Sequence, residues 1–121
     1  MHHKTMTSTE LLKGTLTTII LKLLEEKPRM YGYEMVQLIK HLSGDRILVK
    51  EGSLYPALHK LEADKLLVSE EVFIGKRVRK YYSLTPGGKT AVKTSVDELM
   101  LFLQTINTLI TAQPSGYDIA K

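Results

Sequence analysis

The chain of 121 residues contains no cysteine and no tryptophan. The absence of cysteine excludes disulfides, thiolate nucleophiles and cysteine-based zinc sites, and it fits a reducing compartment. No uninterrupted apolar run is long enough to span a bilayer, and the opening residues Met1–Lys4 lack the apolar core of a signal peptide. We therefore expect a soluble, cytoplasmic protein without a membrane partner.

The motifs of common enzymes are also missing. The sequence has no Gly-rich phosphate loop, no serine within a Gly-x-Ser-x-Gly motif and no pair of carboxylates with a histidine partner. Neither His41 nor His59 has a carboxylate or a second histidine at the spacing of metal ligands. These absences predict that the chain is not an enzyme and that it carries neither a cofactor nor a metal.

Positive charge is concentrated in one part of the chain. The net charge is +4, and residues 1–84 hold 14 of the 17 basic residues but only 10 of the 13 acidic ones. Around Gly75 two segments of strand-like sequence, 68–74 and 78–84, meet in a predicted hairpin whose first strand has Val68, Val72 and Ile74 on its apolar side. The tip carries a dense group of cations: Lys76, Arg77, Arg79 and Lys80. Such a group is typical of a phosphate-binding surface, although a merely solvated turn is the alternative.

Helical periodicity precedes the hairpin. A capping-box spacing from Thr7 to Glu10 predicts the start of a helix that Pro28 ends. Its apolar residues share one broad face: Leu11, Leu12, Leu16, Ile19, Ile20, Leu23 and Leu24. A second helix is predicted from Tyr31 to a stop at Gly44. Its inward residues are expected to be Met35, Leu38, Ile39 and Leu42.

A third helix leads directly into the hairpin. Leu54, Leu58 and Leu61 are spaced to bury one face of it. Pro56 is expected in its first turn, which would start the helix between Lys50 and Ser53. The outward side then presents Ser53, Tyr55, Pro56, His59 and Lys60. A helix of this kind followed by a cationic hairpin predicts an α+β winged helix-turn-helix over residues 1–84.

The last helix is predicted to begin at Thr85-Pro86 and to run to residue 112. Its apolar residues are spaced 4, 3, 4, 3 and 4 apart, as in a heptad seam: Val92, Val96, Leu99, Leu103, Ile106 and Ile110. A helix of this length reaches roughly 40 Å, which favours dimerisation with a second chain, and folding back onto its own domain is the alternative. Residues 113–121 are expected to form a flexible tail.

Four separate motifs give the chain a resemblance to a known family. They are Glu10-Leu11-Leu12-Lys13-Gly14, Tyr31-Gly32-Tyr33-Glu34, Glu51-Gly52-Ser53-Leu54-Tyr55-Pro56-Ala57-Leu58 and Arg79-Lys80-Tyr81-Tyr82-Ser83-Leu84-Thr85. In this order they resemble the PadR family of bacterial transcriptional regulators, in its short form with a single C-terminal helix. The resemblance implies a homodimeric repressor that binds double-stranded DNA.

The resemblance also implies roles for individual residues. Ser53, Tyr55, His59 and Lys60 would form the recognition surface, although Tyr55 and Tyr82 are also typical packing residues. Phosphate contacts would be supported by Tyr31 and Tyr33, and the wing would use Lys76, Arg77 and Arg79. Many relatives carry a denser arginine run at the wing, which Val78 interrupts here.

Short-form relatives bind flat aromatic compounds between their C-terminal and first helices, so a small hydrophobic or planar aromatic effector is expected. Its lining here would be Met6, Leu99, Met100 and Phe102, unless a closely packed seam fills the space. A winged helix that serves protein interaction or RNA binding is the alternative function. The cationic wing favours DNA, because a surface for protein contact needs no such group of cations.

Overall fold

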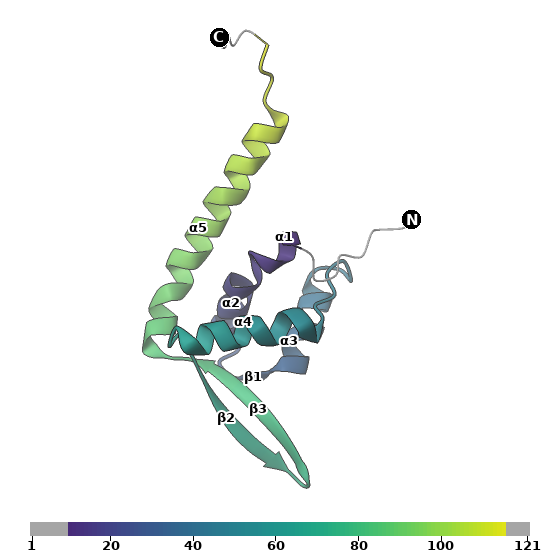
Figure 1. The fold of residues 1–121 in the computed structure, drawn as a ribbon, viewed down its shortest axis with the longest axis vertical. Helices are drawn as coiled ribbons and strands as arrows, with labels where there is room; N and C mark the ends of the chain where they lie inside the picture. Colours follow the sequence, from purple (N-terminus) through teal and green to yellow (C-terminus); the bar gives the residue numbers. More distant parts are fainter. Residues whose placement is uncertain (1–9, 116–121) are drawn as a thin grey trace.

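The computed structural model describes residues 10–115. A body of short helices carries two projections, a β-hairpin and a long C-terminal helix (Figure 1). In chain order the elements are α1 (Glu10–Lys13), α2 (Leu16–Glu26), β1 (Met30–Tyr31), α3 (Gly32–Leu42), α4 (Glu51–Ala63), β2 (Leu67–Ile74), β3 (Arg77–Leu84) and α5 (Pro86–Thr111). The hairpin follows a series of helices and precedes the last helix, as the sequence predicted, but α1 and α2 take the place of the single first helix.

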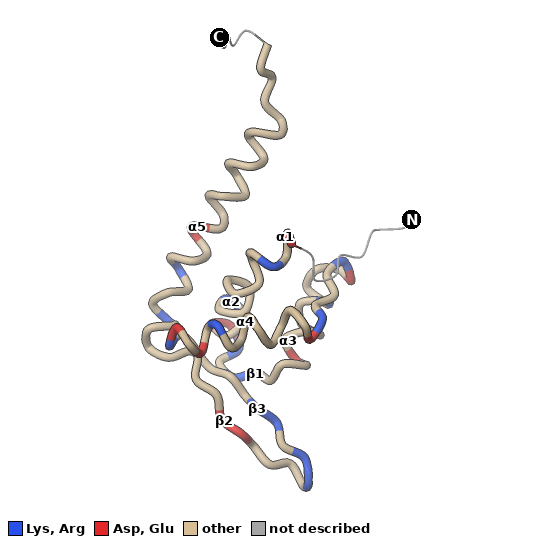
Figure 2. Tube along the Cα trace, viewed as in Figure 1, with Lys and Arg blue, Asp and Glu red and all other residues tan. Residues whose placement is uncertain are grey.

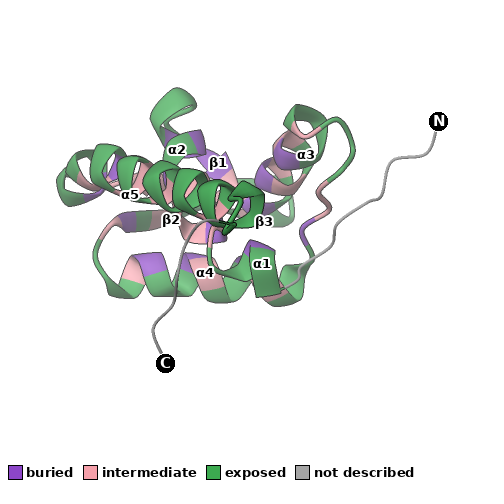
Figure 3. Cartoon of the chain, turned by 90° about the horizontal axis from the view of Figure 1, so that it is seen from above, coloured by how far each residue is buried: buried purple, intermediate pink, exposed green. Residues whose placement is uncertain are grey.

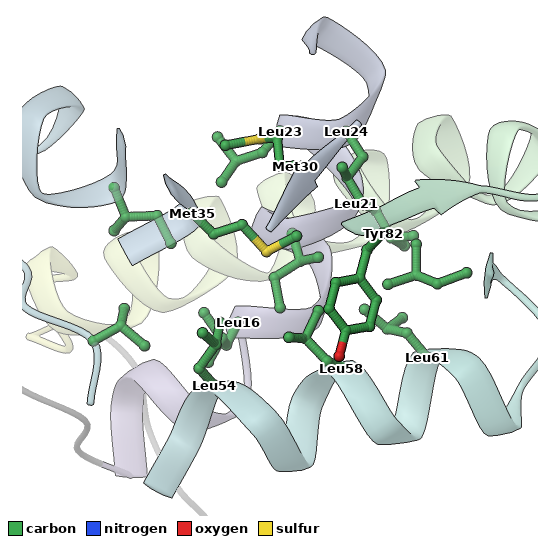
Figure 4. Packing of buried hydrophobic residues seen from close by; sticks show 14 of the residues in the cluster. Leu16, Leu21, Leu23, Leu24, Met30, Met35, Leu54, Leu58, Leu61 and Tyr82 are labelled. Atoms are coloured by element: carbon green, nitrogen blue, oxygen red, sulfur yellow. The ribbon is translucent and has the colours of Figure 1, made fainter. Parts of the chain in front are cut away.

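The core lies between α2, α3, α4 and the root of the hairpin. Tyr82 of β3 is 1% exposed and points toward Leu58 and Leu61 of α4 (Figure 4). Met30 of β1 and Met35 of α3 close the core from the other side. A fully buried apolar side chain of this size contributes roughly 1.5–3 kcal/mol. The core therefore fixes α4 relative to the sheet.

The sheet has the order β1-β3-β2, with both neighbouring pairs antiparallel. Gly75 makes the turn with φ of +63°, in the left-handed region that glycine adopts without a steric penalty. The predicted apolar side of β2 does carry Val68, Val72 and Ile74 on one face, but Val68 is 50% and Ile74 43% exposed. The buried residue is Leu67, at the root. Most of the hairpin projects beyond the helices (Figure 1), so no other element within residues 10–115 covers it.

The single first helix predicted from the sequence is divided into α1 and α2 in the structure. Its capping box lies partly outside the described residues, and within them the chain turns between α1 and α2. Both the backbone N–H and the Oγ1 hydroxyl of Thr15 donate to the carbonyl of Leu12, each at 2.9 Å. Gly14 disfavours a continuous helix at this point. Leu11, one of the residues predicted on the broad apolar face, is 85% exposed.

Two details of α3 and α4 also differ from prediction. Gly44 ends α3 with φ of +63°, as predicted, but Leu42 is 67% exposed because it points away from the core at the last turn. Pro56 is the sixth residue of α4 and not part of its first turn. It removes the hydrogen bond to the carbonyl of Gly52, a penalty that the buried leucines of α4 offset. The start of α4 at Glu51 lies within the predicted range.

The long helix α5 begins as the sequence predicted. Thr85 accepts a hydrogen bond from the Gly88 backbone N–H at 2.9 Å and donates one to the Lys65 carbonyl at 2.7 Å. Its first turns pack against α2, and its C-terminal turns extend past the body (Figure 1). These C-terminal turns are mostly exposed (Figure 3). Neither α5 nor another helix within residues 10–115 has the length and apolar character needed to cross a membrane. The predicted α+β winged helix with a long C-terminal helix is confirmed.

Candidate nucleic-acid interface

Helix α4 presents two flanks on either side of its buried leucines. Tyr55, 39% exposed, lies on the flank near α3, where its hydroxyl approaches the position that a Cβ on Gly32 would occupy, at 3.0 Å. Ser53 lies on the other flank and lines a cavity together with Lys13 of α1 and Lys60. His59 and Lys60 are both exposed. All four residues that the resemblance assigned to recognition are thus at least partly accessible.

Glu62, an acidic residue of α4, contacts both strands of the wing. Ser69 Oγ of β2 donates to Glu62 Oε2 at 2.7 Å, and Lys80 Nζ of β3 lies 3.8 Å from Glu62 Oε1. Both residues stand on the sheet face that also carries the buried Tyr82, since Ser69 and Tyr82 are paired and alternate residues share a face. This face of the wing is therefore turned toward α4.

The cations of the wing are divided between its two faces. Lys80 belongs to the face turned toward α4, whereas Arg77 and Arg79 alternate with it and belong to the opposite face. Lys76 is in the turn. Figure 2 shows the resulting band of basic residues around the hairpin tip. Lys76, Arg77 and Arg79, the wing residues that the resemblance implied, are all on the hairpin. The wing cation that faces α4 is Lys80, which was not among them.

Two tyrosines and two arginines form a stack on the outer face of the sheet. The Tyr31 and Tyr81 rings meet edge to face, with centroids 5.3 Å apart and planes at 72°. The guanidinium of Arg79 lies 4.5 Å from the centroid of Tyr31, and that of Arg29 lies 4.2 Å from the centroid of Tyr81. We call these four residues the arginine–tyrosine stack. It holds Arg79 at the base of the wing's basic band.

Charge within this region is further organised by hydrogen bonds. The pKa of Arg79 is raised, chiefly by its side-chain hydrogen bond with Tyr81. Burial acts to raise the pKa of Glu34, but hydrogen bonds from Lys27 and from the Tyr31 backbone N–H outweigh burial and lower it. Glu34 therefore stays ionised at the start of α3 and fixes the backbone of Tyr31.

Tyr33 and Tyr31, paired in the sequence prediction, have different surroundings. Tyr33 is 64% exposed in the first turn of α3, on the border of a cavity that also includes Lys50 and Tyr55. Tyr31 is half-buried and its ring is occupied by Arg79. Sequence reasoning missed Arg29 and Tyr81, because their partners become visible only from the pairing of β1 with β3.

The predicted seam of α5 divides into two parts. Val92 is 2% exposed within the core of its own chain, and Val96 is half-buried against that core. The first turns of α5 therefore pack against their own domain, as the alternative to dimerisation predicted. Beyond it, Leu103 is 47% and Ile110 77% exposed, and Ile106 is half-buried. Val92 therefore has no free surface for a second chain.

An apolar recess lies where α2 and α5 separate. It has a volume of about 220 Å³ and includes Leu99 and Met100, opposite Ile19 and Leu23. Phe102 does not line this recess and is 58% exposed. Met6, the other predicted lining residue, lies outside the described residues. The recess thus gathers two of the four predicted effector-binding residues.

The fold is that of the winged-helix transcriptional regulators. The sequence model of the "Transcriptional regulator PadR-like family" matches residues 20–94. The chain belongs to this family. Because its members are transcriptional regulators, the prediction that the chain is not an enzyme is confirmed.

Relatives with known sequence or structure agree with this assignment. A transcriptional regulator from Mycobacterium tuberculosis is 47% identical over 55 residues, which make up 46% of this chain and 51%, about half, of that protein. The structure of a transcriptional regulator from Clostridium thermocellum has a TM-score of 0.77 and 31% identity, covering 85% of this chain and 100% of that one. A PadR family regulator from Eggerthella lenta has a TM-score of 0.70 and 31% identity, covering 86% and 88%.

Proposed function

We propose that the protein is a homodimeric repressor that binds specific operator sequences in the cytoplasm and is released by a small hydrophobic effector. The observation that carries this proposal is the Glu62 bridge, which turns one face of the cationic wing toward α4. In this arrangement α4 would enter a major groove while the wing contacts the flanking backbone. Tyr55 and His59, together with Ser53 and Lys60, would read the bases.

The exposed end of α5 supports the dimer. From Leu99 to Ser115 the chain has no charged side chain, and the apolar Leu103 and Ile110 are uncovered. A contiguous exposed apolar surface of this kind is typical of an interface. In the proposed dimer the seam runs through Leu99, Leu103, Ile106 and Ile110, and it sets the two α4 helices about 34 Å apart, as adjacent major grooves require. Residues 1–84 would supply the DNA contacts and residues 85–112 the pairing.

The recess between α2 and α5 supports the effector. A hydrophobic or planar aromatic compound seated against Leu99 and Met100 would separate α5 from the body. That change would alter the distance between the two α4 helices, and it would weaken DNA binding in proportion to the compound's preference for the altered state. Methionine suits such a lining because its side chain adapts to different shapes.

The function is tested by selecting a duplex from a random-sequence pool with the wild-type protein. We expect Lys76→Ala, Arg77→Ala and Arg79→Ala together to weaken binding to all duplexes. They should reduce the slope of log affinity against log salt by up to about 6, because each protomer of the proposed dimer would lose about three phosphate contacts. His59→Ala should instead change the preferred sequence. Equal affinity for single-stranded RNA, or no duplex selected, would favour the alternative of an RNA-binding or protein-binding winged helix.

A further inference from the structure

The tip of the wing carries an apolar pair that the fold does not use. Phe73 is 73% exposed and Val78 is 47% exposed. The two residues face each other across β2 and β3, so their side chains lie side by side on one face of the hairpin. An exposed phenylalanine contributes nothing to the core and favours aggregation, which suggests that a partner covers it.

The pair lies on the face that turns toward α4. From Tyr82 the alternation on β3 runs through Lys80 to Val78, and from Ser69 the alternation on β2 runs to Phe73. Since Lys80 and Ser69 both contact Glu62 of α4, the apolar pair continues the same face toward the tip. The pair therefore lies on the side of the wing that faces α4.

We propose that Phe73 and Val78 pack against the deoxyribose walls of a DNA minor groove, next to the major groove that α4 occupies. This inference rests on the proposed function. Lys76 lies in the turn beside the pair, and Arg77 begins β3 on the opposite face of the hairpin. Positive charge on two sides of the tip would hold the phosphates that border the groove. Apolar side chains flanked by cations are a known way for proteins to enter the minor groove.

The reach of the hairpin fits this position. β2 has eight residues, which extend roughly 23 Å at about 3.3 Å per residue. The hairpin projects clear of the helices (Figure 1), so its tip can pass beyond the roughly 12 Å width of a major groove to the next minor groove. The sugars lining that groove would offer Phe73 an apolar surface beyond the limited contact it has among the described residues, where it is 73% exposed.

The test compares Phe73→Ser with Ile74→Ser. Ile74 is a neighbouring apolar residue of the tip, 43% exposed, but it pairs with Arg77 on the opposite face. The probe is a duplex selected by the wild-type protein from a random-sequence pool. We expect Phe73→Ser to weaken binding roughly ten-fold, as loss of one buried aromatic side chain would, with an unchanged salt slope. Ile74→Ser should bind within about two-fold of wild type.

Hydroxyl-radical footprinting locates the contact, because these radicals attack the deoxyribose hydrogens that line the minor groove. We expect Phe73→Ser to lose protection beside the α4 site while keeping it elsewhere. Equal affinities and footprints for the two variants would overturn the proposal and leave the proposed function intact. A DNA-free Phe73→Ser protein that sediments differently from wild type would also overturn it, since Phe73 would then be covered by a second copy. If wild type selects no duplex, both proposals fail together.

Discussion

The wing and α5 both project from the body, yet their exposed ends differ in charge. The wing tip places apolar Phe73 and Val78 beside cations, whereas α5 has no charged side chain from Leu99 onward (Figure 2). A mixed apolar and cationic surface suits a polyanion, and an uncharged apolar one suits another apolar surface. The difference supports two separate proposed partners, DNA for the wing and a second copy for α5.

The roots of the two projections resemble each other, because both are anchored in the core. Tyr82 anchors the wing, and Val92 together with Gly88 anchors α5. Substitutions at the roots should therefore act on stability, and substitutions at the ends should act on binding. The expected effects decrease from the root of α5, through its end, to the base of the wing.

At the root of α5 we expect the largest loss of stability. A Cβ on Gly88 would lie 2.1 Å from the carbonyl oxygen of Leu66, so the backbone must shift to admit it. Gly88→Ala should lower the free energy of unfolding by about 3 kcal/mol or more, measured by urea denaturation. Gly87→Ala is the control, since its Cβ would be 3.7 Å from the nearest atom, and it should change stability by under about 1 kcal/mol. Equal losses in the two variants would contradict this account of the root.

At the end of α5 we expect loss of dimerisation without loss of folding. Leu103→Asp together with Ile110→Asp would place unpaired charges in the proposed interface, which costs several kcal/mol. Sedimentation should show monomers, and DNA affinity should fall by about 100-fold or more, because the two α4 helices are no longer held together.

A control variant tests whether dimer loss depends on where the added charges lie on α5. Gln104→Asp together with Asn107→Asp adds the same charge to the same stretch of α5, on residues that lie off the seam. This variant should remain a dimer and keep its DNA affinity. Dimers that persist in the Leu103 and Ile110 variant would show that the exposed end of α5 is not the interface.

At the base of the wing we expect a smaller effect, on the position of Arg79. Tyr31→Leu removes the aromatic face beneath that guanidinium and should weaken DNA binding about three- to five-fold, the equivalent of roughly 0.5–1 kcal/mol. Tyr31→Phe keeps the ring and should retain near-wild-type affinity. In an Arg79→Gln background, Tyr31→Leu should have little further effect. Additive losses in the double variant would show that Tyr31 does not act through Arg79.

The sequence predicted local features better than the neighbours of each element. Thr85-Pro86 and Gly44 were located correctly because caps depend on residues within one turn. Leu42 of α3 and Val92 of α5 each fit the apolar periodicity of their own helix, yet Val92 is buried and Leu42 is exposed. Periodicity predicts the apolar face of a helix, but it does not predict how far neighbouring elements extend along that face. The arginine–tyrosine stack depends on pairing β1, a strand of two residues, with a strand about 50 residues further along the chain, and no local pattern reveals this pairing.

The smallest predicted effect concerns Glu34 and its pH dependence. The pKa of Glu34 lies below its usual value of 4.5, because hydrogen bonds from Lys27 and the Tyr31 backbone outweigh the opposing effect of burial. A carboxylate with a lowered pKa stabilises the fold above its unfolded pKa, and the stabilisation is lost as the pH falls through the folded pKa.

We therefore expect Glu34→Gln to lower the stability at about pH 7 by under about 1 kcal/mol, since the Lys27 partner is largely exposed. Thermal unfolding should show this difference from wild type shrinking as the pH falls through the lowered pKa of Glu34, where the wild-type carboxylate becomes protonated. Glu71→Gln, which removes an exposed carboxylate of the wing, is the control and should show little difference at either pH. A Glu34→Gln difference of the same size at about pH 3 would mean that the glutamate acts through packing and not through its charge.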